Sequence, residues 1–245
     1  LKTGGGYQNV VSWGVFPMDD AGNTLLKRGV YTEGKDYPVD TNLIKEYVKH
    51  SYFEDFTTGL NPTEGKTIPN PNKPGAYSFI KSPRYNGKPH QGGPLARMWV
   101  TNPELSKIGQ EKLGVNNFRD IGDAAFSILG RHVARAEETV IVANAVEQWL
   151  SEAKPGKETI VPAPIPDSAE GLGLTEAPRG ALLHYINIKD KVISNYQVTS
   201  ATIWNANPMD DMGQRGPMEQ ALIGVPVPDP ENPVNVGRLI RSFDP

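Results

Sequence analysis

Three short stretches combine side chains that could take part in chemistry. In "TEAPRGALLHY" (175–185), a proline before Arg179 and a glycine after it predict a stiff turn that fixes one guanidinium group. A planar guanidinium held in this way can serve an anionic or reactive centre, although a β-turn with a surface arginine has the same pattern. "YQVTSATIWN" (196–205) is a hydroxyl-rich stretch that offers hydrogen-bond donors, or an ordinary edge strand. "RSFDP" (241–245) alone predicts a surface ion pair.

Other common catalytic patterns give no stronger candidate. The sequence has no GxSxG, no P-loop, and no GxGxxG between a strand and a helix. It has no cysteine, which excludes disulfides, thiolate metal ligands and cysteine nucleophiles within these residues. The histidines lack the spacing of a metal-ligand pair, so each is predicted to be structural: His50, His90, His132 and His184.

Composition sets limits on the class of protein. The chain has 245 residues, 38% hydrophobic and 22% charged, and its net charge of −3 provides no basic field for nucleic acid. No apolar run approaches the roughly 18 to 20 residues of a membrane-spanning helix. The chain starts at Leu1, with no signal peptide in sight, and ends on an Asp-Pro dipeptide. We therefore expect an internal segment of a longer polypeptide.

In the first part of the chain, short elements and one long helix are expected to position the candidate side chains. Residues 1–40 read as strands and turns, and Thr41 can cap a short helix within 41–55. The Pro- and Gly-rich stretch 56–94 is predicted to pack over a surface or a partner. Apolar residues at steps of three and four predict a long amphipathic helix over 117–152.

Two arginines lie on adjacent faces of that helix, and the rest of the chain has shorter elements. Arg131 and Arg135 are expected to form a solvated or ion-paired edge. A Pro-rich connection over 153–174 leads into 180–205, where two β-rich runs flank "KDK" and predict a hairpin. Short helices are predicted at the end of the chain, near 217–223 and 233–242.

Five blocks in a fixed order supply a family resemblance that no single motif carries. They are "GPLARM" (93–98), "TEAPRGAL" (175–182), "YQV…T…WN" (196–205), "RGP…E…AL…G…PV" (215–227) and "R…IRSFDP" (238–245). In this order, the chain from about residue 40 onwards resembles the large subunit of nickel-iron hydrogenases, and the wording of 181–208 leans towards the nickel-iron-selenium branch. The resemblance implies that residues 1–245 are one segment, not independently complete. The segment would be the C-terminal half of that subunit, ending just before its Cys/Sec-x-x-Cys metal ligands.

The resemblance also implies a fold and an activity. The fold would be mainly α with small β regions (α+β), a helical bundle around a buried metal centre. The activity would be the reversible heterolytic cleavage of H2 at a Ni-Fe centre, in a heterodimer with a small iron-sulfur subunit. That partner would pass electrons to a cytochrome-type or other acceptor. A periplasmic location is implied, and membrane association stays open.

Two alternatives also stay open. One is a metal-free relative of the same fold, such as the respiratory complex I subunit. The other is a structural or binding domain without chemistry, which predicts that Arg179 and Asp244 lie far apart and exposed.

Site residues follow from the resemblance position by position. In the family, nickel is held by four thiolates, which lie outside this segment, and the iron carries one carbon monoxide and two cyanides. Arg179 matches the arginine above the open nickel-iron position, and Asp244 matches the acid that pairs with it. Ala177 and Pro178 would wall the diatomic ligands.

Further residues would contact the second cyanide and a hard cation near the C-terminus. Thr202 matches a hydroxyl donor to that cyanide, and Ala201 stands where many relatives have proline. Val198 matches a residue whose backbone carbonyl binds a magnesium or iron ion, since hard cations prefer oxygen ligands. His50 is a candidate for the shell of that ion.

Overall fold

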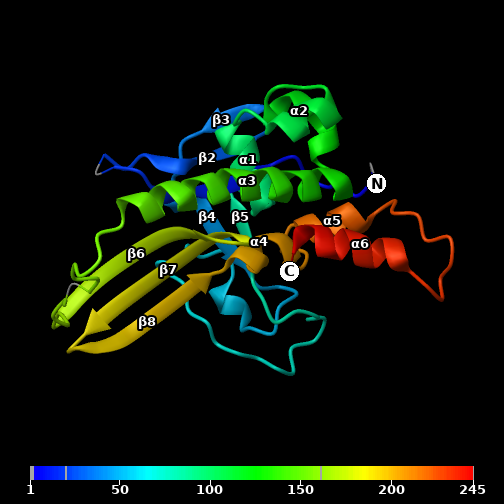
Figure 1. The fold of residues 1–245 in the computed structure, drawn as a ribbon. Coiled ribbons are helices and arrows are strands. Elements are labelled where there is room, and N and C mark those ends of the chain that lie inside the picture. The colour runs from blue at the N-terminus through cyan, green and yellow to red at the C-terminus, as the bar shows by residue number, and fades with distance from the viewer. Residues whose placement is uncertain (1–2, 20, 161, 245) are drawn as a thin grey trace.

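The computed structural model of the chain describes residues 3–19, 21–160 and 162–244, which form a mixed α+β arrangement (Figure 1). The strands are β1 (Val10–Pro17), β2 (Thr24–Thr32), β3 (Lys35–Tyr37), β4 (Ile44–Tyr47), β5 (Ser82–Tyr85), β6 (Ser168–Ala177), β7 (Gly180–Lys189) and β8 (Val192–Thr199). The α-helices are α1 (Pro94–Thr101), α2 (Lys107–Leu113), α3 (Ile128–Glu152), α4 (Ala201–Ala206), α5 (Pro217–Leu222) and α6 (Val234–Phe243). The 3₁₀ helices are η1 (Thr41–Leu43), η2 (Asp55–Thr57) and η3 (Phe118–Ala125).

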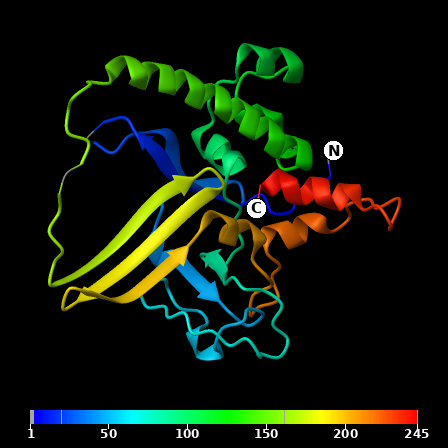
Figure 2. The same cartoon turned by 60° about the horizontal axis from the view of Figure 1, so that its bottom comes forward.

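The strands form small antiparallel sheets, in the orders β1-β2-β3, β4-β5 and β6-β7-β8. Helix α1 packs against β1, β2 and α3, and its side chains from Leu95 to Trp99 are buried. The β6-β7-β8 sheet extends to one side of the molecule and α6 to the other, with α4 between them (Figures 1 and 2). The chain therefore brings the end of β6, helix α4 and the end of α6 towards one central region.

The expected α+β class is confirmed, although strands are as prominent as helices in the described residues and the β regions are larger than predicted. The helical bundle around a metal centre stays a prediction. The short helix expected within 41–55 is limited to the 3₁₀ helix η1 (Thr41–Leu43), and Asp40 caps it in place of Thr41. Ile44 and Glu46 instead alternate inward along β4, with 0% and 3% exposure, and β4 pairs with β5. Burial of every second residue is typical of a strand and not of a helix.

The long helix is confirmed, with a later start than predicted. Ser127 caps α3 by accepting a hydrogen bond from the backbone N–H of Gly130 at 3.0 Å. The preceding segment is the separate 3₁₀ helix η3, because the chain leaves helical geometry at Phe126 and Ser127, whose ψ angles are 62° and 172°. Gly122, with a left-handed φ of 63°, adds a kink within η3 itself. The break could not be read from the apolar spacing, which continues through it.

The predicted hairpin is confirmed as β7–β8. Its turn residues Asp190 and Lys191 both have positive φ, 52° and 62°, as a tight hairpin connection of the primed type requires. The Pro-rich connection is shorter than expected, because β6 begins at Ser168 and adds a third strand to this sheet. The two predicted C-terminal helices are confirmed as α5 and α6.

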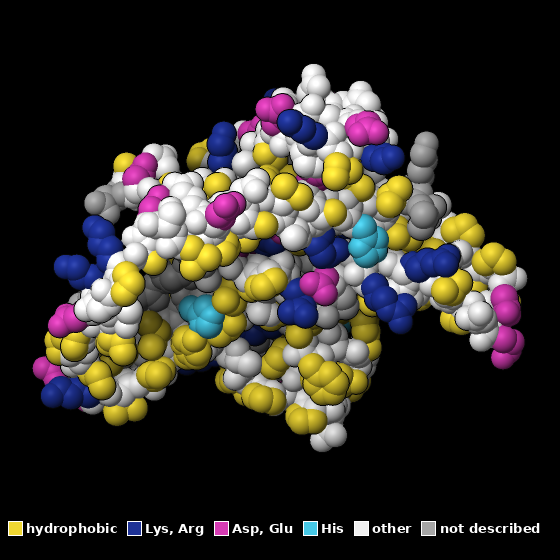
Figure 3. Space-filling model, in the orientation of Figure 1, with side chains coloured by type: hydrophobic (Ala, Val, Ile, Leu, Met, Phe, Trp, Pro, Cys, Tyr) yellow, Lys and Arg dark blue, Asp and Glu magenta, His cyan; other side chains and the backbone are white. Residues whose placement is uncertain are grey.

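Apolar side chains remain exposed over two parts of the surface. Figure 3 shows hydrophobic side chains gathered over α3 and over the β6-β7-β8 sheet. Those at least 37% exposed on α3 and β8 are Leu129, Val140, Val146, Leu150, Val192, Ile193, Tyr196 and Val198. Among the helices of the described ranges, none combines the length and the apolarity that crossing a membrane demands.

Candidate active site

Arg179 and Asp244 lie beside each other although they follow different elements. Arg179 belongs to the two-residue connection between β6 and β7, and Asp244 ends α6 in a left-handed conformation with φ 54°. The Nε atom of Arg179 lies 3.9 Å from Oδ2 of Asp244, and the two side chains are 49% and 42% exposed. The pairing expected from the sequence is present as a long, half-exposed ion pair. This proximity argues against the alternative without chemistry, which required the two residues to be far apart.

The turn that carries Arg179 lies against the glycine pair at the start of α1. Gly180 has φ 133°, and a Cβ atom there would lie 2.5 Å from the backbone nitrogen of Gly93. A Cβ atom on Gly93 would in turn lie 3.1 Å from the carbonyl oxygen of Arg179. Two sequence blocks far apart in the chain therefore meet backbone to backbone, which only glycine permits.

A buried arginine on α1 also binds the backbone of the turn that carries Arg179. Arg97, 3% exposed, donates to the carbonyl oxygens of Ala177 at 3.0 Å and of Pro178 at 2.8 Å. It also donates to Glu176 Oε2 at 2.7 Å and, through Nε and Nη2, to the carboxylate of Glu138 on α3. Arg97 has no local signal of its own in the sequence, although the "GPLARM" block contains it.

Burial also changes the pKa of Glu176, the carboxyl group that Arg97 contacts beside this turn. Desolvation raises the pKa of the Glu176 carboxyl to about 7, while the positive charge of Arg97 and the backbone N–H of Trp13 pull the pKa down. Trp13 donates that N–H to Glu176 Oε1 at 2.7 Å. The carboxyl group is thus fixed by β1 on one side and by α1 on the other.

Ala201 and Thr202 lie in the first turn of α4, where the sequence favoured a strand. Strand β8 ends at Thr199, so only the first part of the hydroxyl-rich stretch is β. Asn205 of α4 accepts a hydrogen bond from the backbone N–H of Gly92 at 3.0 Å. Helix α4 and the Arg179 turn are therefore anchored on adjacent residues of one loop, 92–93.

Val198 lies on β8 next to a buried polar cluster. Its neighbours in sequence, Gln197 and Thr199, point into the protein, where Thr199 donates to Glu46 Oε1 at 2.8 Å. Lys81 donates to Glu46 Oε2 at 3.2 Å and to Gln197 Oε1 at 3.1 Å. Among the described residues, no group of three or more His, Cys, Asp or Glu side chains could hold a metal ion.

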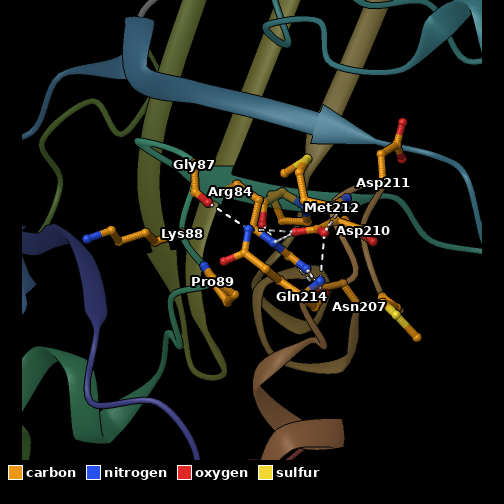
Figure 4. A network of polar contacts seen from close by, with 12 residues as sticks. Arg84, Gly87, Lys88, Pro89, Asn207, Asp210, Asp211, Met212 and Gln214 are labelled. Carbon is orange, nitrogen blue, oxygen red and sulfur yellow. Dashed lines mark hydrogen bonds and ion pairs between the residues drawn. The ribbon is translucent and has the colours of Figure 1, made fainter.

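A second buried arginine fixes the segment after α4 (Figure 4). Arg84 of β5 and Asp210 are both fully buried, and Arg84 Nε donates to Asp210 Oδ2 at 2.6 Å. Arg84 also donates to Asn207 Oδ1 at 2.7 Å and to the carbonyl of Gln214 at 2.8 Å. All of its partners belong to the protein, which assigns the pair to the framework. Sequence reasoning missed it because the partners are distant along the chain.

The α3 arginines do not form the solvated edge that the sequence predicted. Arg131 is 3% exposed and donates to the carbonyl oxygens of Gly4 at 2.8 Å and Gly5 at 2.9 Å. Burial lowers the pKa of its guanidinium to about 9. Arg135 donates to the carbonyl of Ser242 at 3.1 Å. The two side chains tie α3 to the N-terminal segment and to the end of α6.

Three of the four histidines contact backbone carbonyl or hydroxyl groups of the protein, and His132 Nδ1 lies 3.4 Å from Nη1 of Arg135. His90 is buried, with ring nitrogens 2.7 Å from Thr32 Oγ1 and 3.0 Å from the carbonyl of Lys88. His50 Nδ1 lies 3.3 Å from the carbonyl of Gly75, and His184 contacts the Tyr196 hydroxyl. These contacts do not test the place of His50 near an ion.

The whole chain matches one protein family. Residues 1–245 match the model described as nickel-dependent hydrogenase, so the chain belongs to this family. It is 63% identical to the large subunit of the periplasmic [NiFeSe] hydrogenase of Desulfomicrobium baculatum, covering 100% of this chain and 49% of that protein. It is 36% identical to the hydrogenase-2 large chain of Escherichia coli K12, covering 100% and 48%.

Solved structures agree on the fold. The H2-activated [NiFeSe]-hydrogenase of Dm. baculatum matches with a TM-score of 0.96 and 63% identity, over 100% of this chain and 52% of that one. The reduced Ni-Fe-Se hydrogenase of D. vulgaris Hildenborough matches with a TM-score of 0.96 and 57% identity, over the same shares. The chain spans about half the length of the relatives it matches, and its place within that length stays a prediction of the sequence blocks.

The residues present fit the surroundings of a metal centre and not its ligand shell. Thiolates would have to come from outside, because the chain has no cysteine. What the chain offers is a half-exposed cation, Arg179, on a turn with Pro178 and Ala177 beside it. Groups of this kind orient and tune a metal site without binding the metal.

Proposed function

We propose that this chain is the C-terminal half of the catalytic large subunit of a nickel-iron or nickel-iron-selenium hydrogenase. The observation that carries the proposal is the pairing of Arg179 with Asp244, at 3.9 Å, in a chain that belongs to the nickel-dependent hydrogenase family. The reaction would be the reversible conversion of H2 into two protons and two electrons. When bound, the Ni-Fe centre with its carbon monoxide and two cyanide ligands supplies the metal chemistry of heterolytic cleavage.

In this proposal the residues of the chain stabilise charge that develops during the reaction and fix the groups around the metal centre. Arg179 places a permanent positive charge beside the reacting position, where it stabilises negative charge that develops during cleavage. Asp244 limits the directions in which that guanidinium can point. Ala177 and Pro178 exclude water from the diatomic ligands, and the Thr202 hydroxyl donates a hydrogen bond to one cyanide, beside Ala201.

A hard cation near the C-terminus is part of the same proposal. The backbone carbonyl of Val198 would be one ligand of a magnesium or iron ion. The buried ion pair of Glu46 and Lys81, with Nζ 3.2 Å from Oε2, supports a polar site next to this strand. The remaining ligands would come from outside the described residues.

The partner would be a small subunit that carries iron-sulfur clusters and passes electrons to a cytochrome-type or other acceptor. The term "large subunit" in the names of relatives implies a smaller partner. The exposed apolar side chains on α3 and β8 provide surface for the rest of the large subunit and for that partner (Figure 3). The periplasmic relative supports a periplasmic location.

The experiment that tests this function is infrared spectroscopy of the purified natural protein, in the region of metal-bound carbon monoxide and cyanide. One carbon monoxide band with two cyanide bands, together with H2 oxidation, would support the proposal. An empty region in metal-replete protein would reject it and favour the metal-free relative, the subunit of respiratory complex I.

A further inference from the structure

The ion pair of the Arg179 side chain contributes little to the position of this residue. Its ion pair with Asp244 is long and half exposed, and such pairs contribute little to holding a geometry. The backbone of its turn, in contrast, is held by hydrogen bonds and close contacts on two sides. The position of the guanidinium therefore depends on what lies under the turn.

Under the turn, Arg97 uses every N–H of its guanidinium group. Nε and Nη2 hold the Glu138 carboxylate, while Nη1 and Nη2 together hold the Glu176 carboxylate and two carbonyl oxygens. Those carbonyls belong to Ala177 and Pro178, the two residues directly before Arg179. A planar fork with five donors fits this set, and an ammonium group with three donors does not.

The segment that contains Arg97 also contacts helix α4, which lies on the other side of the proposed site. Gly92, five residues before Arg97, donates its N–H to Asn205 of α4, the helix that carries Ala201 and Thr202. Residues 92–97 therefore contact both segments that the proposed function places beside cyanide, namely the Arg179 turn and the start of α4. A shift of the Arg97 side chain would move the Arg179 turn relative to helix α4.

We infer that Arg97 is a positioning residue: its guanidinium sets the place of the Arg179 turn relative to α4, through Glu138, Glu176 and the carbonyls of Ala177 and Pro178. Arg97 is 3% exposed and all its donors are used within the protein, so it acts through the turn and touches no reacting atom. The inference rests on the proposed function. It adds a residue that controls the geometry of the site.

The test compares Arg97→Lys and Glu176→Gln in the complete natural enzyme with the control Arg119→Lys. Arg119 also binds a carboxylate through two nitrogens, at 2.7 and 2.6 Å from Asp36, but on the β3 side of the molecule. For each protein we would measure nickel and iron content, the infrared bands, and kcat and KM for H2 per bound nickel.

The expected result is a loss of turnover without a loss of metal. Arg97→Lys and Glu176→Gln should lower kcat per nickel by roughly 10- to 100-fold, because small misplacements at a reacting centre have effects of this size. At least one cyanide band should shift or split, KM should change little, and Arg119→Lys should behave as wild type. Normalising to nickel removes the effect of poorly folded molecules.

Two results would separate the possible failures. Wild-type kcat and unshifted cyanide bands in metal-loaded Arg97→Lys or Glu176→Gln would overturn the positioning role and leave the proposed function intact. If Arg97→Lys does not accumulate with metal, Glu176→Gln decides by the same criteria. Absence of the carbon monoxide and cyanide bands from metal-replete wild type would instead reject the proposed function itself.

Discussion

The ring of Phe243 lies over the guanidinium group of Arg131, with the guanidinium carbon 3.8 Å from the ring centroid. Phe243 is 3% exposed and directly precedes Asp244, so this contact joins α3 to the end of α6 where the candidate acid begins. A desolvated cation over an aromatic face contributes up to about 2 kcal/mol. The placement of Asp244 therefore depends on a helix far away in the sequence.

Replacing this aromatic ring should loosen the end of α6. We expect Phe243→Leu to lower the thermal midpoint of the natural protein, because the cation over the ring and part of the buried contact are lost, at a cost of about 1–3 kcal/mol. Differential scanning calorimetry would measure the shift. Phe56→Leu is the matched control, since Phe56 is 69% exposed. Equal midpoints for the two variants would contradict the role of the contact.

Arg179→Lys tests the proposed charge beside the metal centre. Lysine keeps the positive charge and loses the planar fork, so we expect the metal centre to assemble and H2 oxidation to fall by roughly 10²- to 10³-fold. Activity per nickel in an H2 oxidation assay would measure the loss. Arg238→Lys, at an exposed position on α6, is the control. Unchanged turnover in Arg179→Lys would remove Arg179 from the mechanism.

Asp244→Asn should have a smaller effect. The 3.9 Å separation and the exposure of both side chains limit the ion pair to about 1 kcal/mol, which corresponds to at most a roughly five-fold loss of turnover with nickel retained. Metal analysis and the same assay check both parts. Wild-type activity with intact metal would show that the pair does not position Arg179, and loss of nickel would show that Asp244 supports the centre itself.

Local signals in the sequence account for the elements that were predicted correctly. The spacing of apolar residues gives α3, the "KDK" turn gives the β7–β8 hairpin, and Pro178 with Gly180 gives the turn that carries Arg179. Each signal lies within a few residues of the element it specifies. The family blocks then placed Arg179 and Asp244 together, which no local pattern could do.

Long-range packing accounts for what was missed. An arginine on a helix looks the same in sequence whether it faces water or buried carbonyl oxygens, so the helical pattern places Arg131 at the surface although it is 3% exposed. Arg97 meets Glu138 and Glu176 only after α1, α3 and β6 have assembled. The Pro-rich pattern of 153–174 predicts a connection and hides the start of strand β6, whose order comes from its pairing with β7.

Gly180→Ala tests the backbone contact beneath Arg179. A Cβ atom would lie 2.5 Å from the nitrogen of Gly93, at a φ of 133° that side chains rarely adopt. We expect a loss of at least about 1–3 kcal/mol of stability and reduced turnover, because the turn must move away from α1. Gly171→Ala on the neighbouring strand β6, where the new Cβ would lie 3.6 Å from Ile186, should be close to neutral. Thermal midpoints and activity per nickel would compare them, and a neutral Gly180→Ala would contradict the close approach.

The buried imidazole of His90 should make stability depend on pH in the acid range. Burial lowers the pKa of His90 from 6.5 to about 4, and the charges of Arg84 and Lys88 act in the same direction. Between these values the unfolded chain binds a proton that the folded chain does not, so stability is full above pH 6.5 and falls as the pH drops towards 4. His90→Gln cannot bind that proton, so its stability should fall less over this window, although the variant should start lower by about 1 kcal/mol or more because a buried hydrogen bond is altered. Thermal midpoints at several pH values from 4 to 8 would measure the slope, with His184→Gln on β7 as the control for loss of an imidazole. Parallel pH profiles for wild type and His90→Gln would show that His90 is not the group responsible.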